Sequence, residues 1–178
     1  MDIGTAFLAQ SREYLTAHYL PKIRSAVAPL AEPDLWWRPN DASNSIANLM
    51  LHLAGNIRQW IVSGVGGAPD RRERAGEFAR RDGLLKDELL TVLSGAVHDA
   101  DAALARISRA ALAEPCTIQG REVTVLEAIF HVVEHFGMHT GQIAYISKLR
   151  TGKDLGFYQM EGGIPRAAWP GHPKSGSA

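Results

Sequence analysis

The longest helical pattern in the sequence runs from Thr124 to Arg150, and it constrains the fold most strongly. It opens with the capping box Thr124-Val-Leu-Glu127 and closes with Lys148 and Arg150 ahead of Gly152. A Thr followed three residues later by Glu satisfies free backbone N–H groups at a helix start, whereas basic residues and a following glycine are typical of a helix end. At 1.5 Å per residue, about 26 residues make a helix of roughly 40 Å.

Three further segments carry helical periodicity and are separated by helix-breaking residues. They are Thr5 to Ala28, which Pro21 should kink near residues 17–20; Ser45 to Ser63, which follows the N-cap residues Asn44 and Ser45; and Leu84 to Ser108, which has one apolar face. The polar stretch GVGGAPDRRERAGEFARRDG links the second segment to the third. This link of about twenty residues is too long for a tight turn, so we expect a crossover or a surface loop. Its arginines Arg71, Arg72 and Arg74 are expected to be solvated, although an anion site is the alternative.

The remaining stretches carry weaker signals. CTIQGREV predicts a turn or a short pairing around Gly120, and Cys116 beside Pro115 suggests a loop. After the fourth helix the sequence is rich in Gly and Pro, so we expect irregular packing as far as about Trp169. We therefore expect one domain over residues 1–170 and a disordered tail over residues 171–178.

Composition excludes several classes of function. The 178 residues, of which 46% are hydrophobic, suit a single core. Lys and Arg equal Asp and Glu at 19 each, so no net charge attracts nucleic acid or an anionic membrane. There is no run of about 18 apolar residues, and a single cysteine excludes an internal disulfide. We expect a cytoplasmic protein that acts on a small molecule, with no nucleic-acid or membrane partner.

His131, His135 and His139 recur at intervals of four in HVVEHFGMHTGQIAYISKLR. A spacing of four advances only about 40° around a helix, so the three side chains form one slowly drifting row. The apolar positions place His139 inside the core-facing stripe, His135 at its margin and His131 outside it. His135 and His139 can therefore present two ring nitrogens to one metal ion.

A third ligand has to come from another element. His52 lies at the edge of the apolar face of the second helix, and Gly55 one turn later would allow a close approach by a neighbouring helix. The spacing of residues in the sequence does not show that His52 lies near His135 and His139, because that depends on how the second and fourth helices pack. The alternative is that these are inert histidines, hydrogen-bonded at a helix interface.

A second metal motif overlaps the same residues. HVVEH matches H-x-x-E-H, in which His131 and His135 would bind zinc and Glu134 would act as the general base of a metallopeptidase. However, His131 and Glu134 both point away from the core-facing stripe. The forward motif H-E-x-x-H is absent.

The segments SNSIANLMLHLAGNIRQWI and TVLEAIFHVVEHFGMHTGQIAYI resemble the DinB/YfiT-like superfamily of metal-binding proteins, and LWWRPNDASNSI resembles one of its uncharacterised branches. The resemblance covers residues 10 to 165. It implies a four-helix bundle that holds a divalent metal through His52, His135 and His139. Gly141 and Gln142, which follow the last of these histidines, also match the pattern of the superfamily. Thr140 departs from it, because many members of the superfamily have an Arg at this position. Some members of the superfamily are thiol-dependent transferases or isomerases that use bacillithiol, mycothiol or glutathione.

Two classes of function follow. In the first, the protein is a metal-dependent enzyme that activates a low-molecular-weight thiol for transfer to an electrophile, or a metal-dependent hydrolase with Glu134 as the only carboxylate adjacent in sequence. In the second, it is a non-catalytic, metal-stabilised binding module related to stress, which could act as a homodimer. Zn or Ni is the first expectation for the metal, with Fe and Mn as alternatives.

Two structural expectations complete the prediction. The three histidines should lie on the inner surface of an all-α four-helix bundle and open to a pocket near one end. Trp36, Trp37 and Trp60 should be packing residues at the entrance to the second helix and on its buried face, because large aromatics beside prolines usually seal a loop onto a core.

Overall fold

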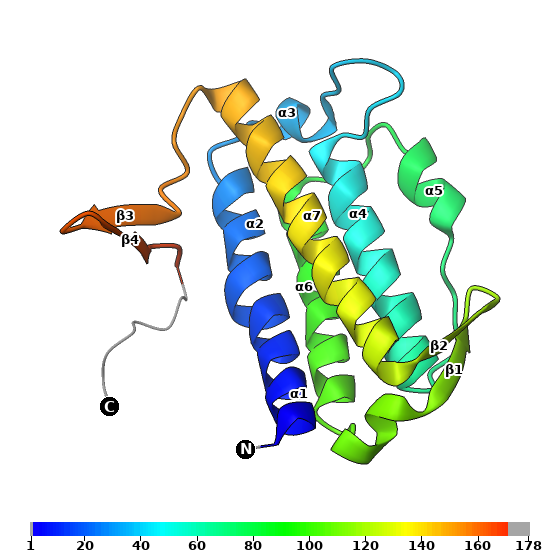
Figure 1. Ribbon diagram of the computed structural model, residues 1–178. Coiled ribbons are helices and arrows are strands. Elements are labelled where there is room, and N and C mark those ends of the chain that lie inside the picture. Colours follow the sequence, from blue (N-terminus) through cyan, green and yellow to red (C-terminus); the bar gives the residue numbers. More distant parts are fainter. Residues whose placement is uncertain (1, 171–178) are drawn as a thin grey trace.

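The computed structural model describes residues 2–170, and its core is a bundle of four long helical segments, as predicted (Figure 1). The first segment is continuous and consists of α1, the π-helical η1 and α2; the second consists of α4 and the π-helical η2; the third and fourth are α6 and α7. Their bounds are Ile3–Glu13 for α1, Tyr14–Tyr19 for η1, Leu20–Val27 for α2, Ile46–Ile57 for α4, Arg58–Val65 for η2, Lys86–Leu104 for α6 and Val125–Thr151 for α7.

Pro21 interrupts the first segment without breaking it. It stands at the second position of α2, and the π-helical turn over Tyr14–Tyr19 lies just before it. Proline has no N–H to donate to the carbonyl four residues back, and a wider helical turn is one way to accommodate that loss. In place of the predicted kink near residues 17–20, the structure has a π-helical turn over Tyr14–Tyr19 within a continuous helix.

The predicted caps of the second and fourth helices agree with the structure, whereas α6 ends at Leu104, before the predicted Ser108. Ser45 caps α4, and its side chain accepts a hydrogen bond from the backbone N–H of Asn48. Thr124 and Glu127 form the predicted capping box of α7, and Gly152 ends that helix with a φ of 65°. A left-handed residue after a helix favours glycine because it has no Cβ to clash with the following carbonyl.

The core lies between α2, α4, α6 and α7 and consists almost entirely of aliphatic side chains. The apolar stripe predicted on α7 is buried there and centres on Phe136, which has no exposed surface. Buried members of that stripe are Val125, Ala128, Val132, Phe136 and Ile143. The stripe fixes the rotation of α7 about its axis, and this rotation decides which histidines face α4.

Short elements decorate the bundle, and several of them were not predicted. They are α3 (Glu32–Trp36), α5 (Arg74–Ala79), the 3₁₀ turn η3 (Arg109–Ala113), and two antiparallel hairpins, β1 (Pro115–Ile118) with β2 (Arg121–Thr124) and β3 (Tyr158–Glu161) with β4 (Ile164–Ala167). The first hairpin corresponds to the short pairing predicted around Gly120, but it is longer, with Pro115–Ile118 paired to Arg121–Thr124. Cys116 therefore lies on strand β1 and not in a loop, and burial raises the pKa of its thiol.

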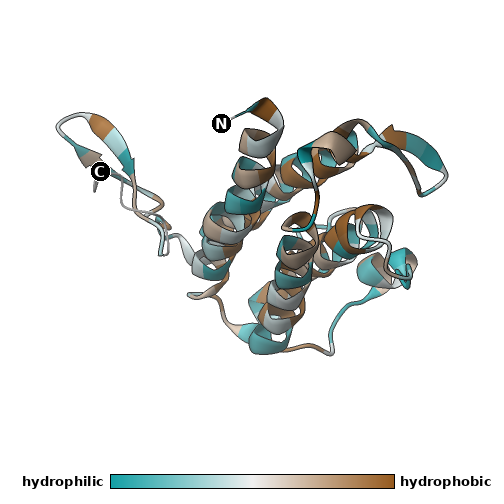
Figure 2. Cartoon of the chain, turned by 90° about the horizontal axis from the view of Figure 1, so that it is seen from below, coloured by the Kyte–Doolittle hydropathy of each residue, from teal (hydrophilic) through white to brown (hydrophobic). Residues whose placement is uncertain are grey.

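The irregular structure predicted before Trp169 is wrong, because this stretch folds into the β3–β4 hairpin. Gly162 and Gly163 form its turn with φ values of 57° and 83°, the left-handed pair that tight hairpins need. The hairpin projects from the side of the bundle in Figure 2.

The tail expected to be disordered, residues 171–178, lies outside the described residues. None of the helices within residues 2–170 combines the length and the apolar character that a membrane crossing requires.

The three tryptophans near the second helix pack in different ways. Trp60 is buried, with 3% of its surface exposed. The indole N–H of Trp36 donates to the carbonyl of Leu84 at 3.1 Å and so ties α3 to the chain that enters α6. Trp37 is half-buried, and the guanidinium of Arg150 lies 4.8 Å from its ring centroid. These contacts agree with the predicted role in packing.

Candidate metal centre

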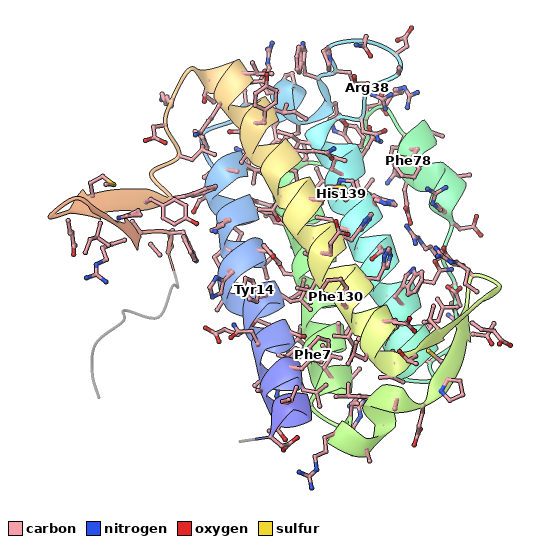
Figure 3. All side chains as sticks on the ribbon, in the orientation of Figure 1. Phe7, Tyr14, Arg38, Phe78, Phe130 and His139 are labelled. Atoms are coloured by element: carbon pink, nitrogen blue, oxygen red, sulfur yellow. The ribbon has the colours of Figure 1, made fainter. Side chains whose placement is uncertain are left out.

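The fold brings together the three histidines that the sequence singles out. His52 on α4 and His135 and His139 on α7 each offer a ring nitrogen, and these three atoms lie within 4.8 Å of one another. His52 and His139 are buried, and His135 is half-buried. The cluster lies midway along α7, where Figure 3 labels His139. The prediction had placed its opening near one end of the bundle. The core-facing stripes of α4 and α7 meet there.

The nitrogens that face one another are the Nε2 atoms. Nε2 of His52 and Nε2 of His135 are 2.9 Å apart, and the ring centroids of His135 and His139 are 4.3 Å apart at an interplanar angle of 89°. Two ligand nitrogens on one zinc ion are typically about 3.3 Å apart, given Zn–N bonds of about 2.0–2.1 Å. The 2.9 Å pair is at hydrogen-bond distance and the three ligand atoms lie within 4.8 Å of one another, so small movements of the rings would bring all three to one ion.

Two of the three rings are oriented by an acceptor on their other nitrogen. Nδ1 of His52 lies 2.9 Å from Oε2 of Glu77, and Nδ1 of His139 lies 2.6 Å from Oε1 of Gln142. The Gln142 oxygen favours a proton on Nδ1 of His139 and leaves its lone pair on Nε2. Nδ1 of His52 also lies 3.0 Å from Nη2 of Arg72, a donor, but this guanidinium is bound to Glu77, whose carboxylate favours a proton on that Nδ1. An oxygen partner of this kind accompanies most histidines that bind metals, because it fixes both the tautomer and the orientation of the ring.

One atom of the cluster is buried without a partner. Nε2 of His139 has no hydrogen bond within the described part of the chain, although its surroundings exclude solvent. Leaving a buried acceptor unsatisfied costs about 1–3 kcal/mol. A cation at the meeting point of the Nε2 atoms would satisfy this lone pair, so the donor set fits a divalent metal.

Burial also favours the neutral form of His135 and His139. Together with the positive charge that His139 and His52 would carry, burial lowers the pKa of His135 to about 3. The pKa of His139 is lowered mainly by burial, even though Gln142 acts in the opposite direction. Neutral imidazole is the form that binds a metal, so the site is ready for a cation near neutral pH.

Arg72 and Glu77 form the part of the site that sequence reasoning missed. The prediction of a solvated Arg72 is wrong: only 3% of its side chain is exposed, and it binds Glu77 through two parallel hydrogen bonds of 2.7 and 2.8 Å. Burial alone would raise the pKa of Glu77, but hydrogen bonds from Arg72 and His52 more than offset this and leave the pKa below its ordinary value. Glu77 therefore faces His52 as a carboxylate.

The short helix α5 carries Glu77 and the neighbouring Phe78 to the site. The Phe78 ring packs on the His52 ring with centroids 4.6 Å apart, and Figure 3 places Phe78 on α5, across α4 from His139. Polar contacts hold the helix in place: Nδ2 of Asn48 donates to the carbonyls of Glu77 and Arg80. No residue of α5 is buried. Its position therefore rests on hydrogen bonds and on this single aromatic contact.

Gly55 leaves the space that Glu77 occupies. A Cβ at this position would lie 1.9 Å from Oε1 of Glu77 and 3.0 Å from Nε of Arg72. The sequence predicted a close helix approach here, and the groups that use the space are Glu77 on the short helix α5 and Arg72 just before it. Without a glycine on α4 at this position, the carboxylate could not reach His52 in this arrangement.

The competing H-x-x-E-H interpretation is not supported by the geometry. His131 is outside the cluster, as predicted, but it is half-buried; its ring packs on Trp60, with centroids 4.2 Å apart. Glu134 is exposed to solvent. The carboxylate that contacts a ring of the cluster is Glu77, which lies on the polar link and is not adjacent to the histidines in sequence.

The metal-free protein should lose stability as pH falls from 7 toward 4. The pKa values of His131, His135 and His139 in the folded chain lie below the ordinary 6.5, chiefly because of burial. Below about pH 6.5 the unfolded chain therefore binds protons that the folded chain does not, and the free energy of unfolding decreases. Urea unfolding of chelator-treated protein across this range measures the effect. A His135→Asn variant should show a shallower dependence, and an unchanged slope would contradict this explanation.

Comparison with known proteins identifies the fold and the family. No curated protein matches the chain. A crystal structure described as the conserved protein of a locus from Enterococcus faecalis is similar, with a TM-score of 0.68 at 19% identity over 86% of this chain and 99% of that one. At this identity the similarity establishes the fold alone. A family profile matches residues 2–162. The chain therefore belongs to DUF1572, a family described as protein of unknown function.

Proposed function

We propose that the protein binds a divalent metal through His52, His135 and His139 in the manner of DinB-like proteins, and that it is an enzyme that uses the metal to activate a low-molecular-weight thiol. The observation that carries the metal proposal is the buried Nε2 of His139, which has no partner within residues 2–170 and belongs to a group of three converging ring nitrogens. Zn or Ni suits such a nitrogen-rich site best, with Fe and Mn as alternatives.

Three protein ligands leave room for an exogenous one. A structural zinc is usually closed by four protein ligands, whereas the candidate group within residues 2–170 contains three histidines. Cys116 lies on strand β1 and is not part of that group. A divalent ion with an open position supplies Lewis acidity, which favours the deprotonated form of a thiol that binds to it.

The surrounding side chains favour thiol chemistry over hydrolysis. A hydrolase needs a base for its attacking water, but both oxygens of Glu77 are occupied by Arg72 and by His52. Glu134 is exposed. A thiol loses its proton to solvent on binding and needs no such base. In this proposal His52, His135 and His139 hold the ion, while Glu77 and Gln142 orient two of the rings.

Thiol binding to the metal-loaded protein should release about one proton per ion, since the thiolate is the species that binds. Calorimetry of untagged protein in buffers of different ionisation enthalpy counts this proton for glutathione, bacillithiol and mycothiol. The cobalt-substituted protein should develop a thiolate-to-cobalt absorption band with the same thiol.

The matched control is S-methylglutathione, which keeps the peptide and lacks the free thiol. It should produce neither the proton nor the band. If none of the three thiols binds at millimolar concentration although one metal ion per chain is retained, the thiol proposal fails while the metal site stands.

A further inference from the structure

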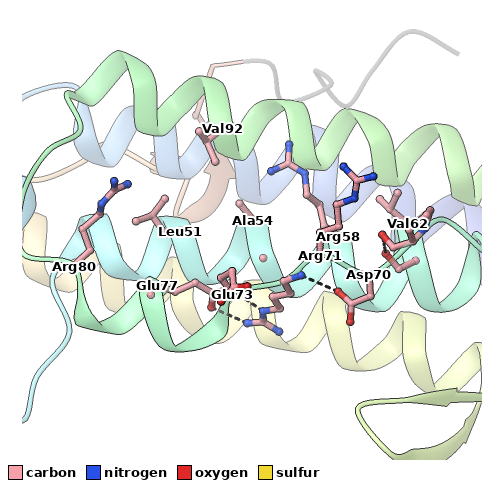
Figure 4. Close-up of a pocket in the computed structure, with 15 residues that line it drawn as sticks. Leu51, Ala54, Arg58, Val62, Asp70, Arg71, Glu73, Glu77, Arg80 and Val92 are labelled. Atoms are coloured by element: carbon pink, nitrogen blue, oxygen red, sulfur yellow. Dashed lines mark hydrogen bonds and ion pairs between the residues drawn. The ribbon is translucent and has the colours of Figure 1, made fainter.

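A cavity of about 570 Å³ is lined by Arg72 and Glu77 of the ion pair but not by His52, which Glu77 contacts. One wall comes from α4 and η2, the second from Val92 on α6, and the third from the segment that carries α5. Figure 4 shows this cavity, with Glu77 among the side chains that line it. Its volume is within the usual range for small-molecule pockets, about 300–1,000 Å³. Because none of the three histidines lines it, its occupant need not touch the metal.

Charges in the cavity are distributed unevenly between its two ends. In Figure 4 Arg58 and Arg71 lie near each other in one half of the cavity, with Val62 and Asp70 beyond them, and Arg80 lies toward the other end. The apolar side chains of Leu51, Ala54 and Val92 lie between the two groups of arginines, on the wall opposite Glu73 and Glu77. Each half of the cavity therefore carries cationic side chains, and one wall between them is apolar. This pattern matches an elongated molecule with a negative group at each end.

The arginines at the ends have little internal compensation. Within residues 2–170 the guanidinium groups of Arg71 and Arg80 make no hydrogen bond or ion pair. Arg58 has only a loose pair, 3.8 Å from Asp99, and both side chains of that pair are about half exposed. Exposed pairs of this kind contribute little, so all three arginines can bind an added anion.

The acidic residues of the lining are partly committed elsewhere. Glu77 is bound by Arg72 and His52, and Asp70 accepts hydrogen bonds from Nε2 of Gln59 and from the backbone N–H of Arg72. The donors to Asp70 are neutral, so Asp70 and Glu73 are the two lining carboxylates whose charge still opposes an anion. Outside the Arg72–Glu77 pair, three cationic groups therefore stand against two carboxylates.

We propose that this cavity binds a small organic dianion, of which a linear dicarboxylate is the simplest form. Arg58 and Arg71 bind one carboxylate, Arg80 binds the other, and the hydrocarbon chain packs on Leu51, Ala54 and Val92. Guanidinium groups suit this task because they bind carboxylates with two parallel hydrogen bonds. The site is independent of the metal proposal, since none of the three histidines lines the cavity.

Titration calorimetry with acetate, succinate, adipate and suberate at constant ionic strength tests the proposal on the full chain as purified. One dicarboxylate should bind at least about tenfold more tightly than acetate, because only a dianion reaches both ends. The double variant Arg58→Gln/Arg71→Gln and the single variant Arg80→Gln should each weaken that binding by about tenfold or more. Arg106→Gln is the matched control, because Arg106 is exposed and does not line the cavity.

A second variant tests the volume of the cavity and not its charge. Gly76 lines the cavity on α5, and a Cβ at this position would meet nothing within 4 Å. Gly76→Leu should therefore fill the space and abolish dicarboxylate binding while metal content stays at the wild-type level. Equal affinity for acetate and every dicarboxylate would overturn the proposal, as would binding that the arginine variants leave unchanged. Neither result would affect the histidine site.

Discussion

Replacing His139 with alanine should reduce the metal content of the purified protein from about one ion per chain to less than about a tenth. The substitution removes one of three nitrogens and leaves two histidines, which make a weak site. Wild-type protein should also gain about 4 kcal/mol of stability when free metal exceeds its dissociation constant about a thousandfold, and the variant should gain none. Metal analysis of untagged protein and thermal unfolding with and without chelator measure the two effects.

The matched control for this change is His131→Ala. His131 lies one turn before His135 on the same helix, but it packs on Trp60 and is outside the ligand group. Its removal should cost packing stability while metal content stays near that of the wild type. Equal metal loss in both variants would contradict the assignment of His139 as a ligand and would point to a general loosening of α7.

Gly55→Ala should lower metal affinity by about 10–100-fold although it changes no ligand. The new Cβ would lie 1.9 Å from Oε1 of Glu77, so the carboxylate has to leave its place beside Nδ1 of His52. Alanine is otherwise favoured over glycine within a helix by about 1 kcal/mol. A loss of stability would therefore report the displaced ion pair and not the helix itself. Competition with a chromophoric chelator gives the metal affinity, and urea unfolding gives the stability.

Gly141→Ala is the appropriate comparison for that experiment. Gly141 lies within α7 two residues after His139, and a Cβ there would meet nothing within 4 Å. This variant should gain a little stability and keep its metal affinity. If Gly55→Ala binds metal as tightly as the wild type does, Glu77 does not position His52 in the way the structure suggests.

The sequence predicted the three histidines because they lie on long amphipathic helices. On α4 and α7 the apolar residues determine which face turns inward, and the same faces carry His52 and His139. What periodicity could not supply was the contact between the two helices, which depends on tertiary packing. The resemblance to a metal-binding superfamily supplied it, and the structure places the three rings together.

The partners of these histidines could not be predicted in the same way. Arg72 and Glu77 lie in a polar link without periodicity, and their burial depends on where that link folds back against α4. The one local signal was Gly55, which indicated a close approach but not its partner. By contrast, the missed β3–β4 hairpin had a readable signal: Gly162 and Gly163 stand between two short runs that could form strands.

The manner in which α5 is attached has a consequence for how the protein opens. Because no residue of this helix is fully buried, detaching it exposes little apolar surface. The contacts that hold it are the hydrogen bonds from Asn48, the packing of Phe78 on His52, and the charged contacts of Glu77 with Arg72 and His52. The four-helix core can remain intact during such an opening. Exchange of the α5 backbone amides with solvent should therefore be governed by the free energy of this local opening, which is below that of global unfolding. In that opened state water would reach His52 from the side that Glu77 occupies in the closed one.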